Sequence, residues 1–425
     1  MGRRMKHTDI GDIPADWKLQ TFEETFRVLS NNTLSRENLN NKGGAVRNIH
    51  YGDILTKFPE VLKCNEEDIP YLNDLSLITA NTQLLQDGDV VIADTAEDDT
   101  VGKTIEVQNL GNGKLVAGLH TIPCRVKKGD FAPGWLGYYM NSNIYHDQII
   151  PFITGIKVSS ISKTAIAETI ILIPPIEEQK RIIDTILKID LLIKTEKIIA
   201  DKILNIKAGC LTQMFPTGEN MTPKMRFLGY SDNWNAYKLL DIADLTSSKR
   251  IHAEEYVNYG IPFYRGKEIS ELKENKPISE TLYITEEKYK HISHLYGAPV
   301  IGDLLISAVG TLGNTWVVDK TPFYFKDGNL IWFKNIKCDS KFLDYAMSTQ
   351  ESQQKISDSA IGSNQKALTM VKLNELEFKI PNDTEQKRIT NYLFNLDSLI
   401  ISHKHKIEKY KSIKSGLISK LISTI

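Results

Sequence analysis

The sequence of 425 residues is poor in cysteine, has no long apolar run and carries no excess of either charge. Its four cysteines are too far apart for a zinc site, which indicates reduced, structural thiols in a cytoplasmic protein: Cys64, Cys124, Cys210 and Cys338. No run of about 18 apolar residues and no signal-peptide pattern occurs in the sequence, so we expect neither a membrane span nor secretion.

The charge balance also excludes some classes of protein. The 52 Lys and Arg residues against 53 Asp and Glu give a net charge of −1, so the chain is not a uniformly basic nucleic-acid binder. A nucleic-acid site would then need positive charge segregated onto one face. The hydrophobic content of 41% and the charged content of 25% are typical of a soluble globular protein. The length indicates two or three domains.

Several segments resemble part of a catalytic or metal-binding motif, but each lacks a residue that the motif requires. "GKT" at 102–104 resembles the end of a phosphate-binding loop, but Glu97 stands where that loop needs a glycine. The carboxylates of "DTAEDDT" at 94–100 are typical of a solvated turn. His291 and His294 lack a third metal ligand in the sequence pattern. We therefore predict no catalytic residue and no metal site in this chain.

An internal repeat organises what is present. "EQKRI" occurs at Glu178–Ile182 and again, 207 residues later, at Glu385–Ile389. The same offset relates four further pairs: Gly155 and Gly362, Pro174 and Pro381, Asp190 and Asp397, Gly209 and Gly416. Closer to each N-terminus the offset drifts, as between Trp17 and Trp234. One unit of about 200 residues has therefore been duplicated, with insertions and deletions in its first half.

A long helix is predicted from each copy of the "EQKRI" motif onward. Apolar residues recur there at alternating intervals of four and three, which predicts an apolar seam packed against a partner helix. At ~1.5 Å per residue a helix over Glu177–Phe215 would be roughly 58 Å long, and its twin is the partner that the chain offers. A pseudo-two-fold relation makes the pair antiparallel. The predicted interface residues are Ile182, Ile186, Ile189, Ile193, Glu196, Ile203, Ile389, Leu393, Leu396, Ile400, His403 and Ile407.

Glu196 and His403 are polar residues within that seam, and they also differ by 207 positions. If the pseudo-two-fold axis crosses the helices at mid-length, the two side chains face each other and fix the register. The alternative is that both are solvated residues at the rim of the seam.

The fold class is α/β of the α+β type. Short apolar runs alternate with Gly, Asn and Asp turns before each helix, which predicts two globular domains with twisted, mixed and largely antiparallel sheets. Two long antiparallel coiled-coil helices separate these domains. The predicted boundaries are a first domain at 1–173, a central helix at 174–215, a linker at 216–233, a second domain at 234–380 and a C-terminal helix at 381–425.

These residues resemble a known family. "PPIEEQKRI" before a long helix, "LTQMFPTGENMTPKMRF" before the second domain, and a second "EQKRI" helix are similar to the specificity subunits of type I restriction–modification systems. "GDVVIADTAEDDTVGKTIEV" and "VAGLHTIPCR" resemble a common form of that family's first target-recognition domain. The resemblance covers essentially the whole chain. The second helix departs from it, because "IPNDTEQKRI" lacks the double proline and one acidic residue.

The resemblance implies a DNA-binding subunit without catalytic activity of its own. Each target-recognition domain would read one half of an asymmetric, two-part site in double-stranded DNA. The helix pair would fix the unread spacer and dock two modification subunits, which use adenosylmethionine to methylate adenine. Restriction subunits would add motor and nuclease activity that depends on ATP and magnesium. We expect none of these cofactors on this chain.

The residues expected to contact DNA are polar or basic and lie in loops. One group lies in the first half of each repeat, where the insertions and deletions occur. The other follows each aligned glycine, where the two repeats have equivalent positions but different residues. In the first domain they are Arg36, Arg47, Asn48, His50, Tyr51, Lys157, Ser159, Ser160 and Lys163. In the second they are Lys249, Arg250, Tyr264, Arg265, Lys267, Ser363, Asn364, Gln365 and Lys366. The alternative for any one of them is an ordinary polar turn.

Three rival functions differ in what they predict, and we do not expect the last of them. A coiled-coil assembly protein with two binding domains would show no salt-dependent DNA binding. An orphan specificity subunit would support methylation without restriction. A nuclease built on Glu-x-Lys triplets, such as Glu286–Lys288, would cleave DNA by itself in the presence of a metal ion.

Overall fold

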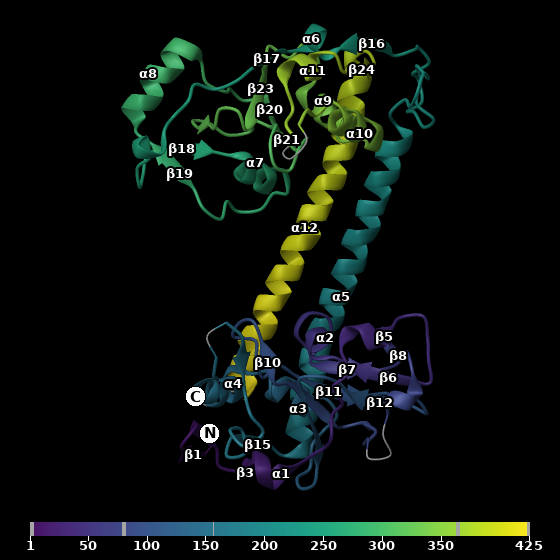
Figure 1. Ribbon diagram of the computed structural model, residues 1–425, viewed down its shortest axis with the longest axis vertical. Helices are drawn as coiled ribbons and strands as arrows, with labels where there is room; N and C mark the ends of the chain where they lie inside the picture. Colours follow the sequence, from purple (N-terminus) through teal and green to yellow (C-terminus); the bar gives the residue numbers. More distant parts are fainter. Residues whose placement is uncertain (1–3, 79–81, 156, 363–365, 423–425) are drawn as a thin grey trace. The chain divides into compact units, whose positions relative to one another are not determined.

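The computed structural model describes residues 4–78, 82–155, 157–362 and 366–422. The chain divides into two compact units. Unit 1 comprises Met1–Thr195 and Ile407–Ile425, and unit 2 comprises Glu196–Lys406. Each long helix therefore contributes one part to each unit (Figure 1). The two units are described separately below.

Unit 1 is built on two sheets. The first has the order β4–β13–β9–β11–β7, with β4 Phe26–Val28, β13 Thr121–Val126, β9 Val90–Ala93, β11 Thr104–Gln108 and β7 Val61–Lys63. The second has the order β12–β6–β8–β5, with β12 Lys114–Ala117, β6 Val46–Ile49, β8 Tyr71–Leu72 and β5 Leu39–Asn40. Neighbouring strands are antiparallel except for β11 with β7 and β12 with β6.

Short elements complete unit 1. Its two-stranded pairs are β1 Met5–Thr8 with β2 Gly11–Pro14, β3 Lys18–Thr21 with β15 Ile170–Ile173, and β10 Thr95–Ala96 with β14 Ser159–Ser160. Its short helices are α1 Phe22–Thr25, α2 Tyr51–Thr56, α3 Trp135–Tyr139 and α4 Asn143–Ile149. Single 3-10 turns occur at Arg36–Asn38, Leu75–Leu77 and Ile150–Phe152.

Unit 2 repeats this plan with fewer strands. Its main sheet is β17–β23–β20–β21, with β17 Asp244–Thr246, β23 Leu330–Lys334, β20 Leu304–Ser307 and β21 Thr315–Val317. A second sheet has the order β19–β18–β22, with β19 Leu282–Ile284, β18 Ile261–Tyr264 and β22 Tyr324–Phe325. A two-stranded sheet pairs β16 Asn235–Lys238 with β24 Glu377–Ile380. Its helices are α6 Leu239–Ile242, α7 Gly266–Lys273, α8 Glu286–Tyr296, α9 Ser340–Met347, α10 Gln350–Asp358 and α11 Met370–Asn374, with a 3-10 turn at Ala253–Glu255.

The strand pairings show the duplication independently of residue identity. The antiparallel set β4–β13–β9–β11 of unit 1 corresponds to β17–β23–β20–β21 of unit 2. The parallel pair β12 and β6 corresponds to β22 and β18, and the pair β3 and β15 corresponds to β16 and β24. The repeat is therefore one topology used twice, and the drifting sequence offset reflects different loop lengths between equivalent strands.

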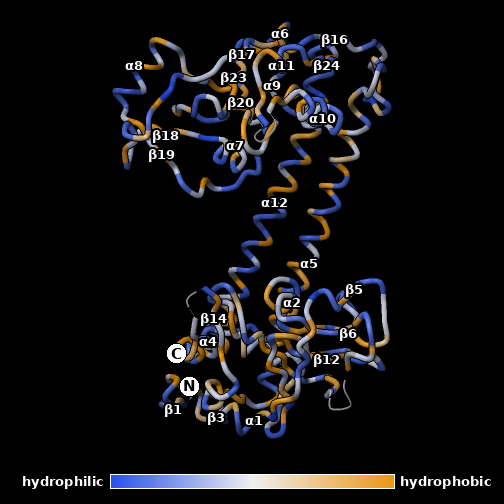
Figure 2. Tube along the Cα trace, viewed as in Figure 1, coloured by the Kyte–Doolittle hydropathy of each residue, from blue (hydrophilic) through white to orange (hydrophobic). Residues whose placement is uncertain are grey.

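The two long helices are α5 Ile176–Gln213 and α12 Asp383–Ile422, close to the predicted bounds. Hydrophobic residues recur along both helices among hydrophilic ones (Figure 2), as expected for helices with one buried stripe. Within unit 2, Glu196 contacts His403 and Lys207 contacts Asp397, so the numbering rises on α5 while it falls on α12. The two helices are thus antiparallel in that unit, in agreement with the prediction.

The repeated "EQ" fastens each helix to its own domain. The fully buried Gln179 side chain accepts a hydrogen bond from the Ala132 amide at 2.8 Å and donates to the Pro174 and Asp130 carbonyls at 2.8 and 3.0 Å. In unit 2, Gln386 accepts from the Asp339 amide at 2.8 Å and donates to Pro381 at 2.9 Å.

The glutamates of the two copies have different partners. The Trp17 indole donates to Glu178 at 3.1 Å, whereas Arg226 donates twice to Glu385, at 2.7 and 2.8 Å. Both copies therefore serve the same end, the attachment of a helix start to its domain. The role of the repeated "EQ" is therefore structural.

The predicted fold class is confirmed: helix and sheet are mixed, and two long helices follow two sheet-containing domains. The compact units are divided differently from the predicted ranges: each unit includes the adjoining parts of both long helices, and unit 2 also contains the segment 216–233 that was predicted as a linker. Among the residues that the structure describes, no helix combines the length and the apolar character that a membrane crossing requires.

Candidate functional site

The loops after the two aligned glycines begin in the same way. Gly155 has φ 111° and Gly362 has φ 124°, a left-handed backbone region that favours glycine. A Cβ atom at Gly155 would lie 2.0 Å from the Val158 carbonyl oxygen. The glycine is therefore needed for the turn.

In unit 1 this loop joins the end of the central strand β9. The Ile161 amide donates to the Asp94 carbonyl at 2.9 Å, and Thr95 pairs with Ser160 in the short ladder of β10 and β14. Unit 2 has the same connection: the Leu368 amide donates to the Ala308 carbonyl at 2.8 Å, and Val309 forms a bridge with Ala367. Each post-glycine loop is thus held beside the end of its domain's central strand.

The other predicted cluster of unit 1 meets this loop through His120. The Tyr51 ring lies edge-on to the His120 ring, with centroids 5.2 Å apart, and next to His50 at 4.7 Å. His120 Nδ1 lies 3.4 Å from an Asp94 carboxylate oxygen. Burial and the Arg36 charge lower the pKa of His50, which favours its neutral form. We call the set Tyr51, Asp94, Thr95, His120 and Ser160 the unit 1 edge.

The matching surface of unit 2 is a cavity of about 590 Å³. His50 precedes α2 as Arg265 precedes α7, so the two residues are equivalent. The Arg265 guanidinium donates to the buried Glu268 at 2.6 Å and reaches Glu280 at 3.3 Å, contacts that raise the pKa of Arg265. The residues lining this cavity, which we call the unit 2 edge, are Arg265, Gly266, Lys267, Ser270, Glu271, Glu274, Lys276, Val309, Gly310, Thr311 and Asn329.

The structure brings together some of the predicted residues. His50, Tyr51, Ser159 and Ser160 converge at the unit 1 edge, and Lys157 and Lys163 are exposed on the same loop. Arg265 and Lys267 line the unit 2 edge, and the exposed Lys366 precedes Ala367 in the bridge with Val309. Ser363, Asn364 and Gln365 lie outside the described residues.

Two predicted residues need correction. Asn48 is fully buried within β6 and accepts a hydrogen bond from Asn32 at 2.7 Å, while Tyr264 is 4% exposed and stacks on Phe323. Both side chains belong to the cores of their domains because their strands lie inside the smaller sheets. Neither can reach a base edge, and we do not retain them as contacts.

Four further predicted residues have partners within their own domains. Arg36 donates to both carboxylate oxygens of Asp53 at 2.9 and 2.7 Å, and Arg47 donates to the Cys64 carbonyl. In unit 2, Arg250 pairs with Asp327 at 2.8 Å. The Lys249 ammonium lies over the Tyr296 ring, 5.2 Å from its centroid.

Sequence reasoning missed Asp94, His120 and Asn329. Asp94 was assigned to a solvated acidic turn, yet its carboxylate accepts a hydrogen bond from Thr95 at 2.8 Å and faces His120. His120 and Asn329 are single polar residues that directly precede the buried strands β13 and β23. A comparison of strand ends between the two repeats could have found them.

The predicted helix-pair residues fall into three environments. At the outer ends the seam merges with the domain cores: Ile182 and Ile186 join the core of unit 1, and Ile389, Leu393 and Leu396 join that of unit 2. Near mid-length, Ile189 and Ile193 pack against Ile407, all in unit 1. Ile400 is buried and Ile203 is half-buried.

The polar pair of the seam is in contact. Glu196 accepts a hydrogen bond from the His403 ring and lies 3.6 Å from the Lys406 ammonium. The His403 hydrogen bond is the leading cause that lowers the pKa of Glu196 below its ordinary value of 4.5. The solvated-rim alternative does not hold, since the side chains of Glu196 and His403 are 13% and 14% exposed.

A second polar contact occurs once in each unit, and its members are related by the same 207 offset. In unit 1, Lys414 of α12 pairs with Asp190 of α5 at 2.8 Å, and the Tyr138 hydroxyl donates to that aspartate at 2.6 Å. In unit 2, Lys207 pairs with Asp397, which accepts from the Tyr345 hydroxyl at 2.7 Å. We call these the Lys–Asp–Tyr junctions. Burial is the leading cause that raises the pKa of both tyrosines, so both remain donors.

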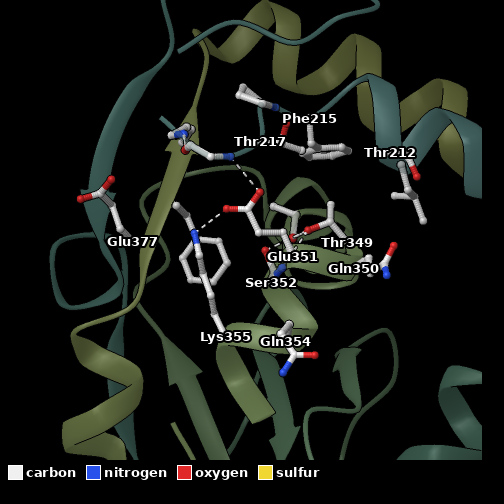
Figure 3. A pocket seen from close by; sticks show the side chains of 16 residues that line it. Thr212, Phe215, Thr217, Thr349, Gln350, Glu351, Ser352, Gln354, Lys355 and Glu377 are labelled. Carbon is white, nitrogen blue, oxygen red and sulfur yellow. Dashed lines mark hydrogen bonds and ion pairs between the residues drawn. The ribbon is translucent and has the colours of Figure 1, made fainter. Parts of the chain in front are cut away.

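A cavity of about 550 Å³ in unit 2 lies near the C-terminal end of α5 (Figure 3). One lining residue, Glu351, accepts a hydrogen bond from the Gly218 amide at 3.0 Å and pairs with Lys355 at 2.7 Å. The carboxylate is thus engaged in holding the segment after α5 against α10. In the part of the chain that the structure describes, no group of three or more potential metal ligands occurs.

Comparisons with known proteins agree on one family. A family model described as "Type I restriction modification DNA specificity domain" matches residues 14–205 and 231–411. A protein of Methanocaldococcus jannaschii, provisionally named the type I restriction enzyme MjaX specificity subunit, is 24% identical over 98% of this chain and 95% of its own length. The type I restriction enzyme MjaVIII specificity subunit of the same organism is 23% identical over 63% of this chain and 65% of its own length.

Solved structures share the fold. A crystal structure of a type I restriction–modification system S subunit from M. genitalium aligns over 100% of both chains, with a TM-score of 0.53 and 13% identity. A chain from a structural study of complex assembly and conformational transition of the type I R-M system aligns over 96% of this chain and 98% of its own length. Its TM-score is 0.59 and its identity is 16%.

The Glu196–His403 contact predicts a measurable coupling. Glu196→Ala, His403→Ala and the double variant should show a favourable interaction free energy in urea unfolding. Because the pKa of Glu196 is lowered in the folded state, its contribution is present above pH 4.5 and is lost as the pH falls below that value. A control cycle on Asp201 and Lys404, both exposed on the same helices, should show no coupling. Zero coupling between Glu196 and His403 at pH 7 would contradict the register role.

Proposed function

The chain belongs to the family of type I restriction modification DNA specificity domains, and from this we propose that it reads DNA for a type I restriction–modification complex. As a specificity subunit it would bind an asymmetric, two-part site in double-stranded DNA, one half for each domain. It would direct methylation and cleavage that other subunits perform. The observation that carries this proposal is the pair of structurally equivalent edges that differ in their polar residues.

The chemistry of the two edges supports different half-sites. The unit 1 edge offers imidazole, hydroxyl and carboxylate groups, which can accept hydrogen bonds from the exocyclic amino groups of bases. The unit 2 edge offers Arg265, Lys267 and Asn329, which can donate to purine edges and to phosphates. Exposed lysines beside each edge, Lys157 and Lys163 in unit 1 and Lys366 in unit 2, suit phosphate contacts.

The helix pair supports docking of two copies of one partner. Among the exposed apolar residues of the two long helices, each unit has one leucine and one isoleucine that the 207 offset relates to those of the other unit. In unit 1 these are Leu192, 44% exposed, and Ile413, 40% exposed; in unit 2 they are Leu399, 47% exposed, and Ile206, 52% exposed. We propose that each pair binds one modification subunit. Two equivalent apolar contacts suit two identical partners.

The cofactors belong to those partners in this proposal. Modification subunits would hold adenosylmethionine, and restriction subunits would use ATP and magnesium. An orphan role, with methylation but no restriction, uses the same surfaces of this chain. The two roles differ in whether a restriction subunit is expressed with it.

The proposed function is tested by expressing the full chain with the modification subunit encoded beside it, in a host without adenine methylation. Sequencing that reports methylated adenines should reveal one two-part motif with an unspecified spacer. Expression of either protein alone should produce no methylation. A contiguous motif, or methylation by this chain alone, would contradict the proposal.

The docking surface predicts a change in stoichiometry. In the Leu192→Asp, Ile413→Asp double variant, two charges interrupt the apolar contact of unit 1, so the complex should hold one modification subunit instead of two. Light scattering coupled to size exclusion measures the mass. The control is Lys197→Asp, which places an acidic side chain at an exposed position of the same helix, about 140° around it from Leu192. Retention of two modification subunits by the double variant would place the docking site elsewhere.

A further inference from the structure

His120 and Asn329 occupy the same place in the two units. The Asp94 amide donates to the His120 carbonyl at 3.1 Å, and the Ala308 amide donates to the Asn329 carbonyl at 2.8 Å. Asp94 is the first residue after β9, and Ala308 is the first residue after the equivalent strand β20. The strands β13 and β23 begin directly after His120 and Asn329. The backbone is thus held alike, while the two side chains differ in hydrogen-bonding character.

The backbone of His120 is itself unusual. Among the residues that the structure describes, four non-glycine residues have a positive φ, and His120, at 54°, is the one that is not asparagine. A residue with a Cβ atom is strained in that region, and such strain is concentrated at functional sites. A glycine would suit this turn better, so the imidazole is kept at a cost in stability.

The neighbours of His120 orient its ring. Thr95 donates its hydroxyl proton to Asp94 at 2.8 Å, so the Thr95 oxygen, 3.3 Å from His120 Nδ1, is free to accept. The tautomer with its proton on Nδ1 satisfies the Thr95 oxygen, and in this tautomer Nε2 is an acceptor. The Tyr51 ring supports the imidazole edge-on, and the His120 side chain is 47% exposed. The ring is thus oriented by its neighbours while about half of the side chain is accessible.

Asn329 presents a different pattern. It is half-buried and lines the unit 2 edge beside Arg265, Gly310 and Thr311. Its carboxamide offers one donor and one acceptor group, which match the N7 acceptor and the N6 donor of adenine in the major groove.

We propose that His120 and Asn329 are specificity-determining residues, one for each half-site. His120 accepts a hydrogen bond through Nε2 from the amino group of an adenine or a cytosine. Asn329 pairs with the N6 and N7 positions of an adenine. This assignment rests on the proposed function and names the residues that carry its specificity.

The test uses the full chain in complex with its modification subunits. The wild-type motif is first determined, and duplexes that carry each single-base change in that motif are then compared for methylation rate. In His120→Gly, discrimination at one base pair of one half-site should fall by about tenfold, while the other half-site is unchanged. In Asn329→Ala, the same loss should appear at an adenine of the other half-site.

Stability separates recognition from a structural role. His120→Gly relieves the positive-φ strain, so its thermal midpoint should equal or exceed that of the wild type. The matched controls are His7→Ala, an exposed histidine that also contacts an aspartate, and Asn235→Ala, an exposed asparagine of unit 2. Both controls should keep the wild-type discrimination at every position.

The possible outcomes are distinct. If the wild type methylates a two-part site and both variants discriminate as it does, the assignment of these residues is wrong and the proposed function stands. A lowered midpoint of His120→Gly with uniform loss of methylation also overturns the assignment of His120, because it indicates a structural role. If the wild type methylates no two-part site, the proposed function fails and this inference fails with it.

Discussion

The hydrogen bonds of one buried glutamine in each repeat attach each long helix to its recognition domain. Gln179 joins the first turn of α5 to the segment before α3, through the Asp130 carbonyl and the Ala132 amide. Gln386 joins the first turn of α12 to Asp339, directly before α9. A buried carboxamide without its partners is costly, so this geometry is strongly favoured. This attachment fixes the start of each long helix against the segment before the first helix that packs on it.

The Lys–Asp–Tyr junctions extend the attachment to the second helix. In unit 1, Lys414 of α12 reaches Asp190 of α5 and Glu60, while Tyr138 of α3 completes the contact. Three elements are thereby held at one place, and unit 2 repeats the arrangement with Lys207, Asp397 and Tyr345. The junction residues, which agree between the repeats, therefore hold the helices and domains together, whereas His120 and Asn329, which differ, lie at the edges. Glu196 and His403 are an exception, because they differ between the repeats and pair with each other in the seam. This division accounts for a duplicated chain whose halves would read different DNA.

The sequence sufficed for the features that depend on local periodicity and on the repeat. The 4-3 spacing is a property of a single helix, so both helices and their starts were predictable to within about two residues. The contact between Glu196 and His403 could be proposed from the offset, because a pseudo-two-fold axis places equivalent residues together at mid-length, but the structure was needed to exclude two solvated residues.

Features that depend on strand pairing were out of reach. Asn48 and Tyr264 carry the polar groups expected of DNA contacts, but the neighbours of their strands bury them. Asp94 and His120 lie 26 positions apart, and the pairing of β9 with β13 brings them together. The positive φ of His120 could not be predicted from the sequence, since histidine does not indicate a left-handed turn as glycine does.

The attachment by glutamine is tested most directly by hydrogen–deuterium exchange in the full chain. Gln179→Ala should accelerate amide exchange in the first turn of α5 and at Ala132, because three buried hydrogen bonds are lost there. Lys180→Ala, one residue along the same phrase and 53% exposed at its side chain, should leave both segments protected as in the wild type. Equal protection of these segments in Gln179→Ala and Lys180→Ala would contradict the account.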